Sequence, residues 1–368
     1  MSVVHLALLT GQSLATGYNS TAYTTAAPAG TYNKKCSTGG IVMVDYAAPN
    51  ASVRNAGSLV SLVEASVETG VAACCNWLSD RYPEQQFIGA SAGVPGTPLA
   101  SRIKGTSIYN AMIGTVTAIN SLVTANGDRL RVLPLCNVDG ESDAYSGAAY
   151  YTNVIQFGPD AEADIQAITL QPEAIPLILS QPIGPTGGTY DTSQAMLDAA
   201  LAYPDRIFLA GPKYQLTSSD DLHLVGQYGY TVMGTMYAQA IQAVAFAGQR
   251  WRGCLPLSAR RSGAVVRVTY DCAIGPVQLD AGVVSNPGNY GFEWYDSTSS
   301  ATVSSVAVVA PNAIDVALSG TPTGASKALR YAFTATPTRE AGGPVTGRRG
   351  CVRDAAGNYS ASFNFPAT

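Results

Sequence analysis

Hydrophobic residues follow two different patterns along this chain, and the change falls near residue 250. Before it, short apolar runs alternate with longer segments in which apolar residues recur at helical spacing. The short runs predict strands at 3–10, 86–90, 130–136, 174–180 and 206–210. The longer segments predict helices at 58–79, 108–126, 148–170 (interrupted at Gly158-Pro159), 193–203 and from His223 through Ala245.

Apolar strands separated by helices are typical of a parallel sheet that is covered on both faces. After residue 263 the helical spacing is absent, and short alternating segments are separated by turn residues. These segments predict strands at 265–271, 303–310, 313–318, 328–334 and 360–365. We therefore expect an α/β domain over 1–250 and an accessory domain resembling a β-sandwich over 263–368. Four arginines at the junction (Arg250, Arg252, Arg260 and Arg261) are interpreted as a solvated hinge.

Composition narrows the possible partners and location. Charged residues make up only 12% of the chain and the net charge is −4, so we expect no nucleic-acid partner. No apolar stretch reaches 18 residues, so we expect no membrane span. The first apolar run lacks a charged leader and a cleavage site, and we interpret it as a strand and not as a signal peptide. The composition nevertheless suits an extracellular or virion-associated protein.

The cysteines and histidines argue against a metal centre. Seven cysteines include no C-x-x-C pair, and the chain has only two histidines. A zinc site made from these residues is not expected, and no other cofactor is expected. Cys254 and Cys272 could pair in the second domain or remain reduced; the sequence leaves both possibilities open.

The candidate chemistry begins with the sequence Asp220-Asp221-Leu222-His223. An Asp three residues before a His can hold one imidazole nitrogen while the other nitrogen accepts a proton. Asp220 is the expected orienting residue, and Asp221 is the alternative. Ser13 directly follows the first strand and is the expected nucleophile. The other histidine, His5, lies inside that strand and is expected to have a packing role.

A serine nucleophile also needs hydrogen-bond donors for the negative charge that develops on the carbonyl oxygen. The backbone amides of Ser13 and Gly96 are the first candidates for this oxyanion hole, and Gly93 is second. A rival nucleophile is Ser91, because residues 89–93 match the G-x-S-x-G pattern of α/β-hydrolases. That motif must lead directly into a helix, whereas here the sequence Val-Pro-Gly-Thr-Pro follows.

Four ordered blocks resemble the SGNH/GDSL hydrolases, and most closely their carbohydrate acetylesterase branch. The blocks are Gly-Gln-Ser at 11–13, Gly-Thr-Pro-Leu at 96–99, Gly-Glu-Ser-Asp at 140–143 and Asp-x-x-His at 220–223. This branch includes proteins similar to sialate O-acetylesterase and acetylxylan esterase. The resemblance covers about residues 1–248. It implies a flavodoxin-like three-layer α/β/α domain, a Ser13-His223-Asp220 triad, an oxyanion hole containing Ser13 and Gly96, and no metal.

Two positions depart from that branch. Leu14 replaces the usual Asn, and Asp139 replaces the Gln that usually precedes Gly-Glu-Ser-Asp. An ionised carboxylate cannot donate a hydrogen bond, so Asn137 is considered as the third oxyanion donor. Gln12, Glu141 and Asp143 are expected to support the site.

The last part of the chain is similar to segments appended to esterase domains in some phage and prophage tail proteins. The combined expectation is a serine esterase that removes O-acetyl groups from a glycan. The alternatives are a catalytically inactive glycan-binding module and a general short-chain esterase.

Overall fold

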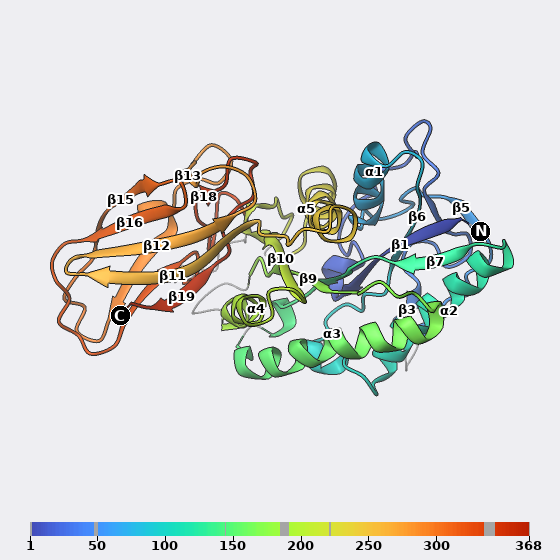
Figure 1. The fold of residues 1–368 in the computed structure, drawn as a ribbon, viewed down its shortest axis with the longest axis horizontal. Coiled ribbons are helices and arrows are strands. Elements are labelled where there is room, and N and C mark those ends of the chain that lie inside the picture. The colour runs from blue at the N-terminus through green and yellow to red at the C-terminus, as the bar shows by residue number, and fades with distance from the viewer. Residues whose placement is uncertain are drawn as a thin grey trace.

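The computed structural model describes residues 2–47, 51–143, 145–184, 191–220, 222–334 and 343–367. Its first part is built on a sheet in which five parallel strands have the order β6-β1-β8-β9-β10 (Figure 1). Their bounds are β1 Val3–Gly11, β6 Gln86–Ser91, β8 Leu135–Val138, β9 Leu177–Gln181 and β10 Ile207–Pro212. Beyond β6 the sheet continues through β2 (Lys34–Cys36) and the antiparallel β5 (Leu59–Ser61). This order is that of flavodoxin-like doubly wound sheets, and the predicted fold class is confirmed.

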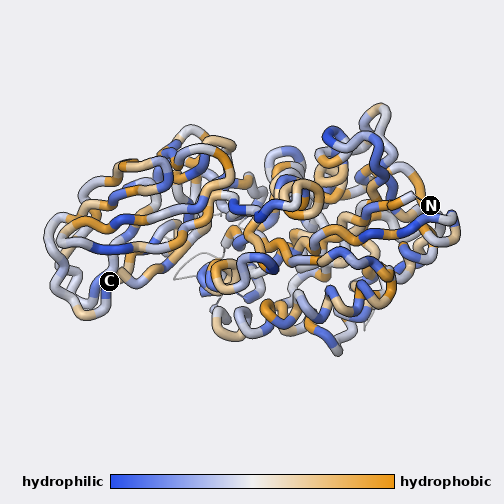
Figure 2. Tube along the Cα trace, viewed as in Figure 1, coloured by the Kyte–Doolittle hydropathy of each residue, from blue (hydrophilic) through white to orange (hydrophobic). Residues whose placement is uncertain are grey.

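Helices cover both faces of the sheet, as Figure 1 shows. Helices α1 (Val71–Arg81) and α5 (Thr231–Ile241) pack together on one face. On the other face lie α2 (Ser107–Ala125), α3 (Gly147–Thr169) and α4 (Asp191–Ala202), with α3 between its two neighbours. The buried apolar residues of α1 and α5 belong to one cluster, and those of α2, α3 and α4 belong to another. The strands between them therefore contribute apolar residues to both clusters. Figure 2 shows hydrophobic (orange) segments in this central region.

In the described residues of the second part, the named strands pair antiparallel, and one short 3₁₀ helix lies at Asn289–Gly291. One sheet has the order β11-β12-β16-β15 and another has the order β14-β17-β19. Their bounds are β11 Cys254–Ser262, β12 Val265–Cys272, β14 Phe292–Asp296, β15 Val303–Ala310, β16 Ala313–Leu318, β17 Lys327–Tyr331 and β19 Phe363–Pro366. A short pair, β13 (Gln278–Leu279) with β18 (Val352–Arg353), also belongs to this part, whereas the short pair β3 (Val44–Asp45) with β4 (Ser52–Val53) belongs to the first part.

This β part begins before the predicted residue 263, because β11 pairs with β12 along its length. Arg260 and Arg261 lie in β11 and are therefore strand residues. Arg250 and Arg252 remain in the connection, where each forms an ion pair with an aspartate. The hinge interpretation fits only these two arginines.

The two parts share a buried contact. Leu209 and Tyr214 of the first part belong to the same apolar cluster as Tyr331 of the second. The side chain of Gln181, at the end of β9, donates to the Ser362 carbonyl (2.9 Å) and accepts from the Ser362 amide (2.6 Å). The Tyr214 hydroxyl donates to the carbonyl of Ser360 (2.8 Å).

Three predicted elements differ from the structure. The segment 58–79 is not one helix: residues 59–61 pair with β2 as β5, and α1 begins only after Gly70, whose φ is +78°. The predicted strand 130–136 is divided by Pro134, which has no N–H to donate, into β7 (Arg129–Val132) and β8; both pair with β1.

The interruption expected at Gly158-Pro159 does not occur, and α3 continues through Pro159. Its buried stripe, Val154, Phe157, Ala161 and Ile165, lies on both sides of the proline. Burial of that stripe outweighs the cost of an interior proline, which is about 3 kcal/mol.

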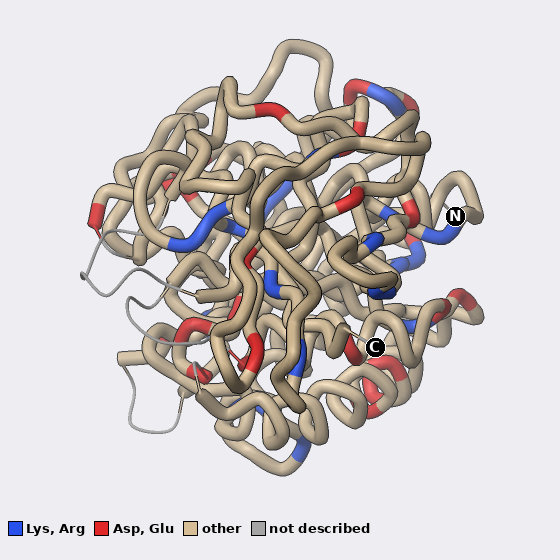
Figure 3. The backbone as a smooth tube through the Cα atoms, turned by 90° about the vertical axis from the view of Figure 1, so that its left-hand side faces the viewer, with Lys and Arg blue, Asp and Glu red and all other residues tan. Residues whose placement is uncertain are grey.

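Two further observations concern the helices and the placement of charged residues along the backbone. Among the helices of the described ranges, none is long and apolar enough to cross a membrane. Lys and Arg lie interspersed with Asp and Glu in the end-on view of Figure 3.

Candidate active site

The candidate site lies where the order of the strands reverses, at the carboxyl ends of β1 and β8. Ligands of doubly wound folds bind at this place because loops from adjacent strands diverge there. The Gln12 amide donates to the Val138 carbonyl (3.0 Å) and keeps the two strand ends together. Gly11 permits this approach: its φ is +134°, and a Cβ there would lie 2.0 Å from the Val138 oxygen. Any side chain at residue 11 would therefore separate the strands.

Ser13 begins a short 3₁₀ helix, Ser13–Ala15, and is 6% exposed. Its carbonyl accepts from the amides of Thr16 (3.0 Å) and Tyr18 (3.2 Å), so the chain folds back immediately after it. In the described part of the chain, no backbone carbonyl accepts from the Ser13 amide. That N–H is therefore free to bind a substrate oxygen.

Asp220 and His223 form the predicted pair. Asp220 Oδ2 lies 2.9 Å from His223 Nδ1, and Oδ1 accepts from the amides of Leu222 (2.9 Å) and His223 (2.5 Å). Burial acts to raise the pKa of Asp220, but these hydrogen bonds outweigh it and lower that pKa to about 2. The carboxylate is thus ionised at neutral pH and orients the imidazole. Asp221, the alternative orienting residue, lies outside the described residues.

Tyr18 and Asn19 connect the Ser13 turn to this pair. The Tyr18 ring lies against the His223 ring with centroids 4.9 Å apart, and its carbonyl accepts from the Tyr230 hydroxyl (2.8 Å). Asn19 Nδ2 donates to Asp220 Oδ2 (2.7 Å), the oxygen that also faces His223. Both halves of the predicted triad therefore lie at the same edge of the sheet. No direct hydrogen bond joins Ser13 to His223 in the described part of the chain.

Sequence reasoning missed Asn19. The Asn19 backbone has φ of +58°, a left-handed conformation that Asn tolerates better than most residues. Asn at a turn after a candidate nucleophile is the available signal. It indicates a tight turn, but it does not reveal a partner 201 residues away.

The loop after β6 contains the predicted oxyanion donors. It runs beside the Ser13 turn: the Val94 amide donates to the Gly11 carbonyl (3.0 Å), and a Cβ on Gly93 would lie 2.7 Å from Ala15 Cβ. Gly96 follows in an exposed turn with φ of +71°, and none of the described backbone carbonyls accepts from its amide. The Gly93 amide, by contrast, is 3.3 Å from the Ser91 hydroxyl.

Asp143 holds the far end of this loop. Its two carboxylate oxygens accept from the Leu99 amide at 3.2 and 3.0 Å. Burial, together with the nearby charge of Asp139, raises the pKa of Asp143 to about 6. Asp143 thus connects the loop after β8 to the loop that carries Gly96, which is a supporting position.

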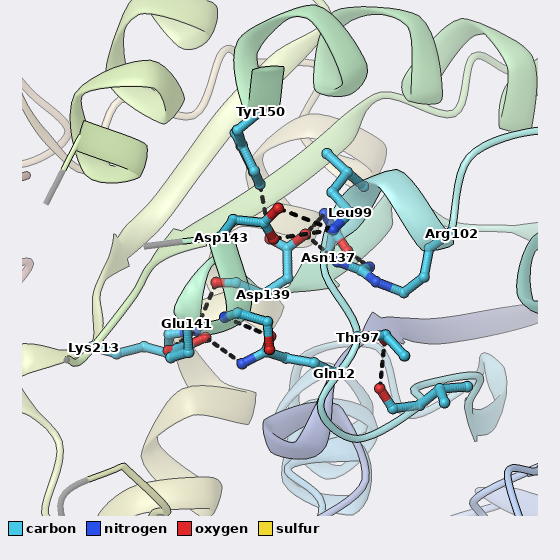
Figure 4. A network of polar contacts seen from close by, with 12 residues as sticks. Gln12, Thr97, Leu99, Arg102, Asn137, Asp139, Glu141, Asp143, Tyr150 and Lys213 are labelled. Atoms are coloured by element: carbon cyan, nitrogen blue, oxygen red, sulfur yellow. Dashed lines mark hydrogen bonds and ion pairs between the residues drawn. The ribbon is translucent and has the colours of Figure 1, made fainter. Parts of the chain in front are cut away.

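Asp139, the unusual residue of the third block, lies in a fully buried polar network (Figure 4). Arg102 approaches it at 2.5 Å, and the Tyr150 hydroxyl donates to its other oxygen (2.8 Å). Asn137 Nδ2 donates to Asp139 (2.9 Å), and its Oδ1 accepts from Arg102 (3.0 Å). The Asn137 side chain is therefore engaged inside this network and not exposed at the Ser13 turn.

Gln12 and Glu141 form a second buried network with Lys213, also in Figure 4. Gln12 Nε2 donates to Glu141 (3.0 Å), and Gln12 Oε1 accepts from the Ser142 amide (3.0 Å). Lys213, just after β10, lies 2.7 Å from the other Glu141 oxygen. Burial raises the pKa of Glu141, and the Lys213 charge opposes that shift. These contacts connect the loops that follow β1, β8 and β10, directly next to Ser13 in the chain.

The remaining candidates have structural surroundings. Ser91 is fully buried at the end of β6 and donates to the Ala15 carbonyl (2.7 Å), and the chain continues into a loop and not a helix. His5 is buried, contacts Gln85 at 2.9 Å and packs on Phe87, which confirms its packing role. Cys254 and Cys272 face each other as free thiols, 3.9 Å apart. Within the described ranges, no group of three or more His, Cys, Asp or Glu is arranged to hold a metal ion.

Comparisons with known proteins show that this chain shares its fold with a solved enzyme structure. No protein-family model matches the chain, and no curated protein matches it. Two solved structures, a protein from Arabidopsis thaliana and NanS, match with TM-scores of only 0.44 and 0.42, at 16% and 10% identity. They cover 65% and 68% of this chain and 97% and 98% of their own, and their TM-scores are too low to carry an argument.

A third structure matches the whole chain. It is a carbohydrate acetylesterase from Xanthomonas citri, with a TM-score of 0.65 at 13% identity; the match covers 100% of this chain and 81% of the other. None of these three structures tests the predicted similarity of the C-terminal segments to phage and prophage tail proteins. This chain therefore shares the fold of a carbohydrate acetylesterase over its entire length.

Proposed function

We propose that this protein is a serine esterase that removes O-acetyl groups from a carbohydrate. The observation that carries the proposal is the connection of the Asp220–His223 pair to the turn that follows Ser13. Tyr18 lies on the imidazole ring and Asn19 binds the carboxylate. A nucleophile, a base and an orienting carboxylate on one edge of a sheet are the requirements of acyl transfer through serine.

The chemistry proceeds in two balanced steps. Ser13 Oγ attacks the acetyl carbonyl carbon while His223 Nε2 takes its proton. When the C–O bond to the sugar breaks, His223 returns this proton to the departing sugar oxygen, and an acetyl-serine remains. A water then gives a proton to His223 as its oxygen attacks the acetyl carbon. When the C–O bond to Ser13 breaks, His223 passes this proton to Ser13 Oγ, and acetic acid leaves and ionises to acetate. Asp220 remains ionised throughout and holds the imidazole by Nδ1.

The negative oxygen of each tetrahedral intermediate needs donors that are not already satisfied. The amides of Ser13 and Gly96 meet that requirement among the described residues, because no backbone carbonyl accepts from either. Gly93 is less suitable because its amide faces the Ser91 hydroxyl. Asn137 is less suitable as a third donor, because its side chain is fully buried and is bound to Asp139 and Arg102.

A sugar ester is favoured over other esters by the whole-chain fold match to a carbohydrate acetylesterase. Two exposed tyrosines, Tyr18 and Tyr145, lie next to the proposed loops in the sequence and offer rings on which a sugar can rest.

The test is hydrolysis of p-nitrophenyl acetate and of longer acyl esters, together with acetate release from acetylated xylan. We expect short acyl chains to be preferred. Ser13→Ala should lose activity by at least about 10³-fold because the nucleophile is gone. Ser91→Ala is the matched control, a second serine at a strand end, and should remain active.

Other results would change the proposal. Activity lost only in Ser91→Ala would indicate an α/β-hydrolase mechanism. A preference for long acyl chains would indicate a general esterase. A folded protein that binds glycan and hydrolyses none of these esters would indicate an inactive binding module.

A further inference from the structure

A second feature lies directly beside the proposed catalytic residues: a cleft of about 510 Å³. One wall comes from Thr16, Tyr18 and Asn19, the segment that follows Ser13. Its lining also includes residues 39–42, Tyr46 and residues 64–67. Volumes of this size accept a small ligand such as a sugar residue. Tyr18 separates the cleft from His223, because its ring lines the cleft and also lies on the imidazole.

Two cations line this cleft, and neither is neutralised by an acid. Lys35 Nζ donates to the Val63 carbonyl (2.6 Å), and Arg54 Nη1 donates to the Val42 carbonyl (3.4 Å). Among the residues that the structure describes, no carboxylate forms an ion pair with Lys35 or Arg54. Each of these hydrogen bonds uses one N–H of its cation. The other N–H groups of the Lys35 ammonium and the Arg54 guanidinium remain available to a ligand.

Glu64 is the only acid among the lining residues, and its carboxylate binds Thr69 and forms no ion pair with Lys35 or Arg54. Its Oε1 accepts from the amide (3.2 Å) and the hydroxyl (2.7 Å) of Thr69, and the side chain is buried. Burial raises the pKa of Glu64 to about 7, so this group is about half ionised at neutral pH and mostly neutral below it, and it cannot offset the two cations. The cleft therefore carries a net positive charge next to two exposed tyrosines, Tyr18 and Tyr46.

We propose that this cleft binds an anionic sugar residue, with Lys35 and Arg54 on its acidic substituent and the tyrosines beside its ring. A carboxylate and a phosphate share the required chemistry, because both accept several hydrogen bonds from a guanidinium and an ammonium. Aromatic rings and a few fixed donors are the usual composition of a small-ligand site. That the bound sugar belongs to the acetylated substrate rests on the proposed function.

The test is titration calorimetry of the full chain with glucuronate, glucose 6-phosphate and glucose. We expect at least one charged sugar to bind roughly tenfold or more tightly than glucose, which corresponds to one charged hydrogen bond. The variant Lys35→Ala/Arg54→Ala should lose this preference. Lys34→Ala is the matched control: Lys34 adjoins Lys35 on β2, is not among the cleft residues and should leave binding unchanged. The charged sugar that binds identifies the substituent.

Three results would overturn the inference: equal binding of charged and neutral sugars, no loss in the double variant, or the same loss in Lys34→Ala. None of these free sugars carries an acyl ester, so the measurement does not depend on the proposed catalysis. An inactive protein that still binds glucuronate through Lys35 would refute the proposed esterase and leave the cleft intact. An active esterase without any preference for charged sugars would refute only the cleft.

Discussion

At residue 11 the chain requires glycine for two independent reasons. The backbone φ of +134° is unfavourable for other residues, and a Cβ would lie 2.0 Å from the Val138 oxygen. Gly11→Ala should therefore separate β1 from β8 and destabilise the protein by several kcal/mol, beyond the roughly 1–2 kcal/mol of left-handed strain alone. Urea unfolding measures the change. Gly127→Ala is the control, since φ is +80° there with no atom within 4 Å of the added Cβ; equal losses in the two variants would contradict the steric argument.

At Asp220 the charge, and not only the hydrogen bond, is expected to matter. Asp220→Asn keeps the size of the side chain but no longer stabilises a protonated imidazole, so kcat for acetyl ester hydrolysis should fall by about 10³–10⁴. Because the pKa of Asp220 is about 2, the wild-type carboxylate stays ionised above about pH 4. The loss caused by the substitution should therefore be present throughout that range. Asp205→Asn, in an exposed ion pair, is the control; a variant of Asp220 with undiminished kcat would remove it from the mechanism.

Glu64 makes stability depend on pH in a defined direction. Its pKa is raised to about 7 in the folded protein, so the folded state binds the proton more tightly than the unfolded state. This group therefore weakens folding progressively as pH rises from about 4.5 to about 7. Glu64→Gln, which still accepts from Thr69, should be more stable than wild type above about pH 7 by on the order of 3 kcal/mol, and no more stable near about pH 4. Chemical unfolding at both pH values decides this; a constant difference would contradict it.

At the scale of elements, the ends of β1, β8 and β10 depend on one buried ion pair. Lys213 and Glu141 are both inaccessible and 2.7 Å apart. Lys213→Met would leave the buried Glu141 carboxylate without an opposite charge, which should cost about 3–5 kcal/mol at neutral pH and less at acid pH, where Glu141 takes up a proton. Lys104→Met removes the exposed pair with Asp164 and should cost less than about 1 kcal/mol. Similar losses in the two variants would show that the buried pair has no special role.

The same networks show what the sequence could and could not predict. Strand-end positions follow from local hydrophobic patterns, so the sequence alone is enough to expect Ser13, Asp220 and His223 on one rim. Partners that come from distant elements leave no local pattern. Arg102 neutralises Asp139 from a loop 37 residues earlier, and Lys213 reaches Glu141 from another strand end. Likewise, residues 59–61 belong to the segment 58–79, in which apolar residues recur at helical spacing. They form a strand nevertheless, because they pair with the edge of β2.

At the scale of the whole molecule, the contact between the two parts determines whether they unfold together. Gln181 satisfies the carbonyls of Ser193 and Ser362 and the amide of Ser362, all in a buried setting. The change of pattern near residue 250 predicts a boundary, but it contains no information on such a contact. We propose that the two parts form one cooperative unit, with Gln181 among the residues that couple them.

Calorimetry tests this coupling directly. We expect the wild type to unfold in a single transition. Gln181→Ala leaves three buried backbone groups unsatisfied, each worth about 1–3 kcal/mol, and should lower the midpoint or split the transition in two. Gln156→Ala, which removes only an exposed hydrogen bond to Asp160, should change neither. Two transitions in the wild type would show that the parts are independent. In that case the Gln181 contact only docks one part on the other, and the β part is not needed for folding of the part that carries Ser13 and His223.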